Sequence, residues 1–132
     1  MIGLDTNVIL RYIMQDDPVQ ARQATALIES LTADEPGFIP LIVLVEMVWV
    51  LFSAYRLNRH QVAQVLEQLA QLKEIRLDST DLVLKALRIF KAGTADFSDC
   101  LIERIAANQG CQKTVTFDIA AAKSAGMVLL SA

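Results

Sequence analysis

The chain has 132 residues, of which 54% are hydrophobic, and its formal net charge is −3. This length fits one domain over residues 1–132 and excludes two domains with separate cores. The hydrophobic share is high, which predicts nonpolar surface that a partner or a second copy covers, while the negative charge by itself argues against a polyanionic ligand.

Membrane and export signals are weak. The apolar stretch "FIPLIVLVEMVWVLF" is shorter than the roughly 20 residues of a membrane span and contains Glu46. The start "MIGLDTN" lacks the basic region of a signal peptide, and the spacing of Cys100 and Cys111 suggests neither a metal site nor a disulfide framework. We therefore expect a cytoplasmic protein without membrane partners and with two thiols in its core.

The first part of the chain alternates short apolar strands with amphipathic helices. Pro18 and Pro40 each suit the first turn of a helix, and Asn58 suits a helix cap. In chain order we predict a strand at 1–5, helices at 7–14 and 18–31, a strand at 37–39, and helices at 40–55 and 59–72.

The remaining part continues the alternation. Gly93 and Gly110 are placed to end helices, and "TVTFD" is rich in β-branched residues, as a strand requires. We predict a strand at 74–77, a helix at 78–93, a polar elbow at 94–99, a helix to 108, a strand at 114–118, a short helix at 119–126 and a strand at 127–130. Such alternation predicts an α/β fold with a mostly parallel sheet covered by helices on both faces.

Two aspartates directly follow predicted buried strands. Asp5 follows "MIGL" and Asp118 follows "TVTF". Each precedes a helix, so each could be a helix cap. Because sites in parallel sheets form beyond the carboxyl ends of the strands, both could also lie in one site.

Glu46 lies within a helix that is apolar almost all round. Either this carboxylate faces solvent, or it is buried and needs a cation or a partner, because an isolated buried carboxylate costs several kcal/mol. Asp96 and Asp99 flank a helix start three residues apart, which by itself suits a cap and a favourable charge in the first turn.

Together these five acids could converge into one pocket. Crowded carboxylates repel one another unless a divalent cation is bound, and oxygen ligands without His or Cys favour Mg²⁺ or Mn²⁺ over zinc. Such a site supports hydrolysis of phosphodiesters by metal-activated water. Setting these five charges aside changes the formal net charge from −3 to +2, which weakens the objection to a polyanionic ligand.

Four phrases make the chain resemble the PIN-domain ribonucleases, and among them the VapC-type toxins of toxin–antitoxin pairs. These phrases are "IGLDTNVILRYI", "VLVEMVWVL", "ADFSDCLIERIAANQGC" and "TVTFD", and together they span nearly the whole chain. The resemblance implies a three-layer α/β/α sandwich with a short, mostly parallel sheet, formed as a single PIN-like domain. It also implies a homodimer and Mg²⁺- or Mn²⁺-dependent endonucleolytic cleavage of RNA.

The resemblance also assigns residues. The family's four catalytic and metal-binding acids fall on Asp5, Glu46, Asp99 and Asp118. Asp96 matches a frequently acidic position and is expected to be an auxiliary metal ligand. Supporting roles are expected of Thr6 and Asn7, which follow the first aspartate, and of Thr116, which faces the same edge as Asp118. Pro40-Leu41-Ile42 departs from the Ser or Thr often found at that helix start, which puts substrate contacts there in doubt.

Other readings fit less well. A haloacid-dehalogenase-like phosphatase needs a second aspartate where Asn7 stands, and a receiver domain needs a phosphoacceptor and a strand-end lysine that "EIRLDST" does not provide. His60 at a helix start is expected to be solvated. The alternative that stays open is a catalytically idle PIN scaffold that binds a partner protein and regulates transcription.

The expected protein partner is a cognate antitoxin that also binds DNA. The predicted helix pair at about 40–72 carries Trp49, Phe52 and Tyr55 beyond Glu46, more apolar bulk than a small sheet covers. In VapC-type relatives a similar region holds an amphipathic antitoxin segment, whose basic side chain reaches the acids. We expect such a segment to block the site of a homodimer.

Overall fold

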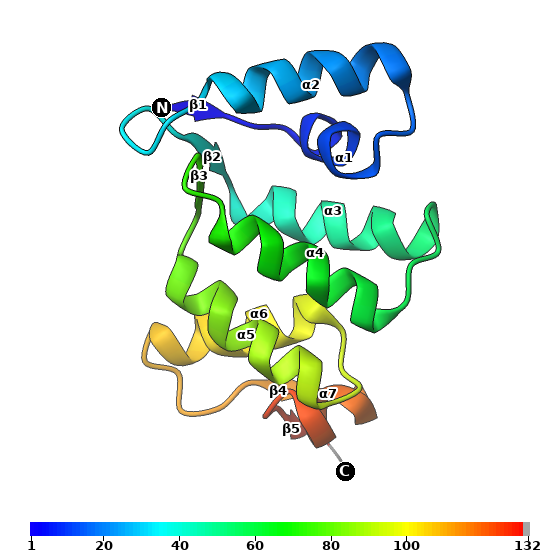
Figure 1. Cartoon of the computed structure of the whole chain (residues 1–132). Helices are drawn as coiled ribbons and strands as arrows, with labels where there is room; N and C mark the ends of the chain where they lie inside the picture. Colours follow the sequence, from blue (N-terminus) through cyan, green and yellow to red (C-terminus); the bar gives the residue numbers. More distant parts are fainter. Residues whose placement is uncertain (131–132) are drawn as a thin grey trace. The chain divides into compact units, whose positions relative to one another are not determined.

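The computed structural model describes residues 1–130, and the chain divides into two compact units. Unit 1 comprises Met1–Thr80, drawn from blue to green in Figure 1, and unit 2 begins at Asp81. Each unit is built from helices and short strands. A single domain over 1–132 stays a prediction, and its last two positions lie outside the described residues.

Unit 1 contains a three-stranded parallel sheet in the order β1-β2-β3. Phe38 in the central strand is paired with Gly3 on one side and Arg76 on the other. The helix α1 packs against α2 and α3, while α4 packs against α3 and β3. The elements of unit 1 are β1 (Ile2–Gly3), α1 (Thr6–Met14), α2 (Pro18–Ser30), β2 (Gly37–Ile39), α3 (Leu41–Ser53), α4 (Arg59–Gln71) and β3 (Ile75–Leu77).

Local sequence explains where several of these helices begin. The Asp17 side chain accepts a hydrogen bond from the Gln20 amide at 2.9 Å, and Pro18 occupies the first turn of α2. Asn58 and Gln61 form a reciprocal capping box at the start of α4. These short-range signals fix the helix starts close to their predicted positions.

As far as residue 130, unit 2 contains a two-stranded parallel sheet, β4-β5, and three helices. Its core includes Phe90 and Phe97, whose rings meet edge to face with centroids 5.9 Å apart. Gly110, with φ of +94°, follows the end of α6, as glycine does at helix C-termini. The elements are α5 (Thr80–Ala92), α6 (Phe97–Asn108), β4 (Val115–Thr116), α7 (Ile119–Ser124) and β5 (Val128–Leu129).

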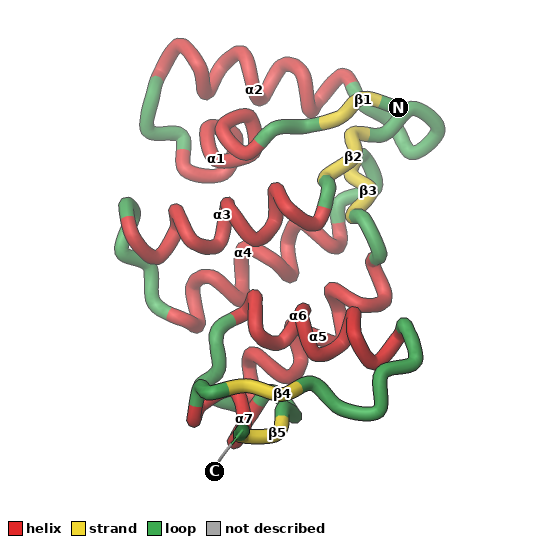
Figure 2. Tube along the Cα trace, turned by 180° about the vertical axis from the view of Figure 1, so that it is seen from behind, coloured by secondary structure: helices red, strands yellow, loops and turns green. Residues whose placement is uncertain are grey.

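The α/β class and the parallel pairing of short strands are confirmed, and the described strands form two sheets (Figure 2). The predicted burial of the strands that precede the two aspartates is wrong. Ile2 in β1 is 48% exposed and Val115 in β4 is 51% exposed. The reason is the position of each strand: β1 is an edge strand, and β4 belongs to a sheet of only two strands.

Three smaller expectations are also decided. Cys100 is buried as predicted, but Cys111 is exposed, so the expectation of two core thiols is wrong for one of them. Cys111 follows Gly110 in the turn after α6, where no core surrounds it. His60 is exposed as expected. Between residues 1 and 130 no helix combines the length and apolarity that crossing a bilayer requires.

Candidate active site

The first group of predicted site residues lies where β1 leads into α1. Asp5 is the N-cap of α1, and its Oδ1 accepts a hydrogen bond from the Thr6 amide at 2.8 Å. The capping alternative is therefore realised for Asp5. That hydrogen bond is made to Oδ1, so capping does not exclude a second role for the carboxylate.

Thr6 connects this cap to α3. Its side chain is buried, and its hydroxyl donates to Oε1 of Glu46, forty residues further along the chain. One residue thus supports both predicted site acids of unit 1, through its backbone amide for Asp5 and through its hydroxyl for Glu46. This is the kind of hydrogen-bonded support that carboxylate ligands have in metal sites.

Glu46 faces solvent on α3, which settles the choice left open by the sequence. The opposite side of the helix is buried through Leu44, Met47, Val48 and Leu51. Burial thus creates no demand for a cation at Glu46. The carboxylate is instead oriented by Thr6.

Asn7 lines a groove between α1 and α2 of about 300 Å³. Val8, Arg11 and Gln20 line the same groove. In the part of the chain that the structure describes, no hydrogen bond joins the Asn7 side chain to Asp5, and its supporting role stays a prediction.

The start of α3 shows a capping residue that sequence reasoning missed. Pro40 is at the N-cap and makes no side-chain cap hydrogen bond, but Oδ2 of Asp78 accepts from the Leu41 amide at 3.2 Å. Asp78 directly follows β3, so it lies beyond the carboxyl end of a strand, as Asp5 does. The only signal in the sequence was this position after a strand, because the partner is 37 residues away.

In unit 2, Asp118 begins α7 as Asp5 begins α1. Its Oδ1 accepts from the Ala121 amide at 2.8 Å, and its own amide donates to the Thr116 hydroxyl at 3.0 Å. Thr116 therefore braces the backbone of Asp118. Its expected supporting role beside the Asp118 carboxylate stays a prediction.

Asp96 and Asp99 lie at the start of α6. Asp96 is at the N-cap but makes no side-chain cap hydrogen bond, so capping does not explain its carboxylate. Partial burial raises the pKa of Asp99 above its ordinary value, and the nearby charges of Asp96 and Asp118 raise it further. Asp96 and Asp118 are thus each close enough to Asp99 to disfavour its negative charge.

A serine ties these two segments of unit 2 together. The Ser124 hydroxyl, on α7, accepts from the amides of Thr94 and Ala95 at 3.1 and 2.9 Å and donates to the Ala120 carbonyl. The residues just before Asp96 are therefore held against the helix that Asp118 begins. Ser124 was not predicted as a site residue, and its sequence context gives no sign of this contact.

The donor set fits a hard divalent cation, since both groups contain only carboxylates supported by hydroxyls and amides. Within residues 1–130, however, no three His, Cys, Asp or Glu side chains lie close enough together to hold a metal. Electrostatic repulsion acts over longer distances than ligation, so the shifted pKa of Asp99 and this observation are compatible.

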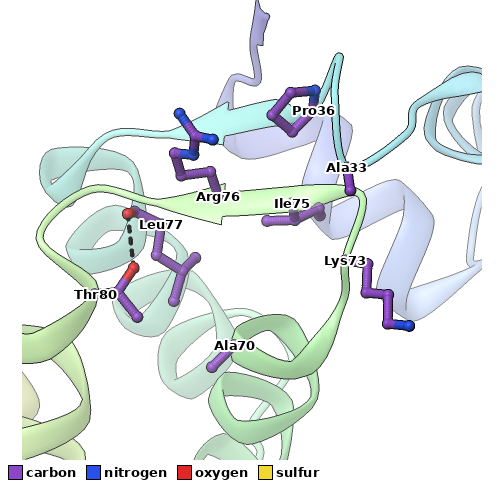
Figure 3. A pocket seen from close by; sticks show the side chains of 8 residues that line it. All are labelled: Ala33, Pro36, Ala70, Lys73, Ile75, Arg76, Leu77 and Thr80. Atoms are coloured by element: carbon purple, nitrogen blue, oxygen red, sulfur yellow. Dashed lines mark hydrogen bonds between the residues drawn. The ribbon is translucent and has the colours of Figure 1, made fainter.

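A separate pocket adjoins β3. Figure 3 shows Ile75, Arg76 and Leu77 along one side of it, with Lys73 nearby and the Thr80 hydroxyl donating to the Leu77 carbonyl at 3.0 Å. Its volume is about 150 Å³, and none of the predicted acids lines it. It is therefore not the candidate active site.

Comparison with known proteins identifies the family. The PIN domain family matches residues 2–127. A curated relative, the VapC ribonuclease of Aquifex aeolicus (strain VF5), is 23% identical over 114 residues, which cover 86% of this chain and 84% of the relative. No solved structure gave a significant match. Because the family match covers nearly the whole chain and includes all five predicted acids, the chain belongs to the PIN domain family.

Proposed function

We propose that this chain is a divalent-metal-dependent endoribonuclease and the toxin of a toxin–antitoxin pair. The observation that carries the proposal is the family match over residues 2–127, a range that contains all four acids that the resemblance assigns to the catalytic site. The similarity to a protein named VapC ribonuclease supports RNA as the substrate. An idle scaffold is less well supported, because such a scaffold has no need of these acids.

The proposed metal ligands come from both units. Asp5 and Glu46 belong to unit 1, and Asp96, Asp99 and Asp118 belong to unit 2. The proposal requires the two groups to act on one substrate phosphate. Mg²⁺ or Mn²⁺, when bound, would activate water and stabilise negative charge on the phosphate and the leaving oxygen.

The chain's own residues restrict the directions of several of these carboxylates. Thr6 fixes the direction of Glu46, and the capping hydrogen bonds fix Asp5 and Asp118. The raised pKa of Asp99 reflects a charge that is disfavoured in the absence of a cation. These acids gain favourable interactions when a cation binds, which supports an affinity for divalent metal.

The decisive experiment measures cleavage of RNA by the purified chain. We expect activity with Mg²⁺ or Mn²⁺, loss of activity in EDTA, and recovery when the metal is restored. Asp5→Asn and Asp99→Asn should each abolish cleavage, one in each unit. Asp34→Asn, a matched change at an exposed acid outside both groups, should leave it unchanged.

Undiminished cleavage by either site variant, with circular dichroism showing an intact fold, would remove the mechanism. A parent protein that binds a partner and DNA but cuts no RNA under any metal would favour the idle scaffold.

We also propose a homodimer and a cognate antitoxin. The expected docking region, α3 and α4, now has a defined surface. Trp49 is exposed, whereas Phe52 and Tyr55 are half-buried, and the Tyr55 hydroxyl is hydrogen-bonded to Asp16 and Arg11.

An antitoxin segment across α3 and α4 would inhibit the nuclease by bringing a basic side chain to the acids and excluding metal. Co-expression with the product of the gene immediately upstream, as the candidate antitoxin, followed by binding and nuclease assays, tests this mode. A tight complex with full activity would contradict it, and a monomer at micromolar concentration would contradict the dimer.

A further inference from the structure

Ser124 uses its whole hydrogen-bonding capacity to join two segments of unit 2. Its hydroxyl accepts from the amides of Thr94 and Ala95 at 3.1 and 2.9 Å, and it donates to the Ala120 carbonyl at 3.1 Å. A hydroxyl offers one donor and two acceptor sites, so all of them are occupied. The turn between α5 and α6 is thereby fixed to α7, although Ser124 lies 29 residues beyond Ala95.

Gly93 lets the same two segments approach closely. A Cβ atom at this position would lie 2.4 Å from the Cβ of Ser124 and 2.7 Å from its Oγ. These distances are far below van der Waals contact, so any larger residue at Gly93 would push the turn away from α7. The lack of a side chain at Gly93 and the hydroxyl of Ser124 therefore favour the same arrangement.

Both of the joined segments lead to predicted site acids. Asp96 directly follows Ala95 and is the N-cap of α6, which carries Asp99 in its first turn. Asp118 is the N-cap of α7, the helix of Ser124. Since Asp96 and Asp118 are near enough to Asp99 to act on its charge, repulsion favours separation of the two helix starts when no cation is present. The hydrogen bonds of Ser124 oppose that separation.

We propose that Ser124 is a positioning residue, whose hydroxyl holds the starts of α6 and α7 at a separation from which Asp99 and Asp118 act together on a divalent cation. The proposal rests on the proposed function for the presence of that cation, and it concerns the acids of unit 2 alone. Because the fold already restrains the two helix starts, the acids need less ordering when the cation binds. Loss of the hydroxyl should therefore lower the affinity for metal.

A purely structural role of Ser124 makes a different prediction. Ser124→Ala would then lower stability, because two amides lose an acceptor, but the metal affinity of the folded protein would stay the same. A positioning role acts through the acids, so the effect of Ser124→Ala on metal affinity should largely disappear once Asp118 is replaced. A double-mutant cycle with Asp118→Asn therefore separates the two roles.

The test measures Mn²⁺ binding by the full chain without RNA, from the EPR signal of free Mn²⁺. The temperature is chosen so that circular dichroism shows every variant folded. We expect the Kd for Mn²⁺ to rise about 10-fold in Ser124→Ala, as loss of support for metal ligands commonly causes. In the Asp118→Asn background the same change should alter the Kd by no more than about 2-fold. Gly93→Ala, which keeps the hydroxyl but displaces the turn, should also weaken binding.

Ser53→Ala is the matched control. The Ser53 hydroxyl donates to the Trp49 carbonyl at 2.8 Å, four residues earlier in α3, as Ser124 donates to Ala120 in α7. This bond stays within one helix and reaches no turn that precedes a predicted acid. Ser53→Ala should therefore bind Mn²⁺ with the affinity of the parent.

A second measurement uses the parent alone. Amide hydrogen exchange is followed by NMR in EDTA and in Mg²⁺. The amides of Thr94 and Ala95 should be protected under both conditions, because the hydrogen bonds to Ser124 are formed by the fold and do not require the cation.

Three results would overturn the positioning role while the parent binds Mn²⁺. These are parental Mn²⁺ affinity in Ser124→Ala, an equal loss of affinity when Ser124→Ala is made in the Asp118→Asn background, and rapid exchange of the Thr94 and Ala95 amides in EDTA. A parent that binds no Mn²⁺ would overturn the positioning role together with the proposed metal dependence. A parent that cuts no RNA, but whose Mn²⁺ binding is weakened by Ser124→Ala as expected, would uphold the positioning role and overturn the proposed function.

Discussion

Thr6 makes hydrogen bonds to both predicted site acids of unit 1, Asp5 and Glu46. It is buried, its amide donates to Asp5 and its hydroxyl donates to Glu46. The sequence suggested that a residue after the first aspartate would brace the aspartate. The structure adds that the same residue reaches the glutamate on another helix, a contact that neither residue's local context reveals.

Thr6→Val should separate this positioning role from stability. Valine has nearly the same shape, and Glu46 is exposed and can be hydrated, so we expect a loss of about 1 kcal/mol or less in unfolding free energy. RNA cleavage should fall well below that of Thr6→Ser, which keeps the hydroxyl. Denaturant unfolding and initial rates measure the two quantities. Equal rates in the two variants would show that the Thr6 hydroxyl does not position Glu46 for catalysis.

Asp99 gives a prediction about pH. Its folded-state pKa is raised by burial and by Asp96 and Asp118, so the folded protein binds this proton more tightly than the unfolded chain does. The ionised Asp99 therefore lowers stability at neutral pH, and the penalty disappears as pH falls below the ordinary value of 3.8. Without metal, Asp99→Asn should be as stable as the parent or more stable at pH 7, with the difference vanishing in acid.

The measurement is urea unfolding of both proteins from pH 7 down to pH 3 in EDTA. Asp81→Asn, an exposed acid on the neighbouring helix α5, controls for the general effect of removing one negative charge. A large loss of stability in Asp99→Asn at pH 7 would mean that the carboxylate is needed for the fold of α6.

Among the elements, α3 is capped at its N-terminus by a residue that is distant in sequence and follows β3. Its N-terminus begins at Pro40-Leu41, which provides no local cap, and Asp78 after β3 accepts from the Leu41 amide. Asp78→Ala should therefore lower the unfolding free energy by about 1 kcal/mol, as loss of a helix cap does, while Asp34→Ala should have little effect. Thermal or urea unfolding measures this. Equal stability of Asp78→Ala and Asp34→Ala would show that the cap is not used in solution.

The elements also show what sequence can and cannot predict. Caps made within three residues, such as Asp17 with Gln20 and Asn58 with Gln61, are visible in the sequence, and these helices were placed within a residue or two. The cap by Asp78 and the tie by Ser124 join residues about thirty or more apart, so no local pattern reports them. The prediction that the strands before Asp5 and Asp118 are buried was wrong for a related reason. The exposure of a strand depends on how many neighbouring strands it has, which no local pattern reports.

At the scale of the whole molecule, the family could be predicted, because four acidic motifs in a fixed order span the chain and the family match covers residues 2–127. The exposure of Glu46 could not, because its helix is apolar on every side in sequence and only packing decides which face is covered. Each unit brings its own acids and its own supporting hydroxyl, Thr6 in one and Thr116 in the other. The proposed function requires both groups to act on one substrate phosphate through bound divalent metal.

This assignment leads to a prediction about the melting temperature. An ion that binds only the folded state stabilises it by about 2.7 kcal/mol at one hundred times its Kd, which corresponds to several degrees. We expect Mg²⁺ or Mn²⁺ to raise the melting temperature of the parent by several degrees. EDTA should remove this increase. If ligands from both units are needed, Asp5→Asn and Asp99→Asn should each greatly reduce the increase, although one alters unit 1 and the other unit 2. Asp34→Asn should keep the increase in melting temperature.

An increase in melting temperature that survives in Asp5→Asn but not in Asp99→Asn would mean that the ion binds the acids of unit 2 alone. No increase in the parent at millimolar metal would contradict metal binding altogether.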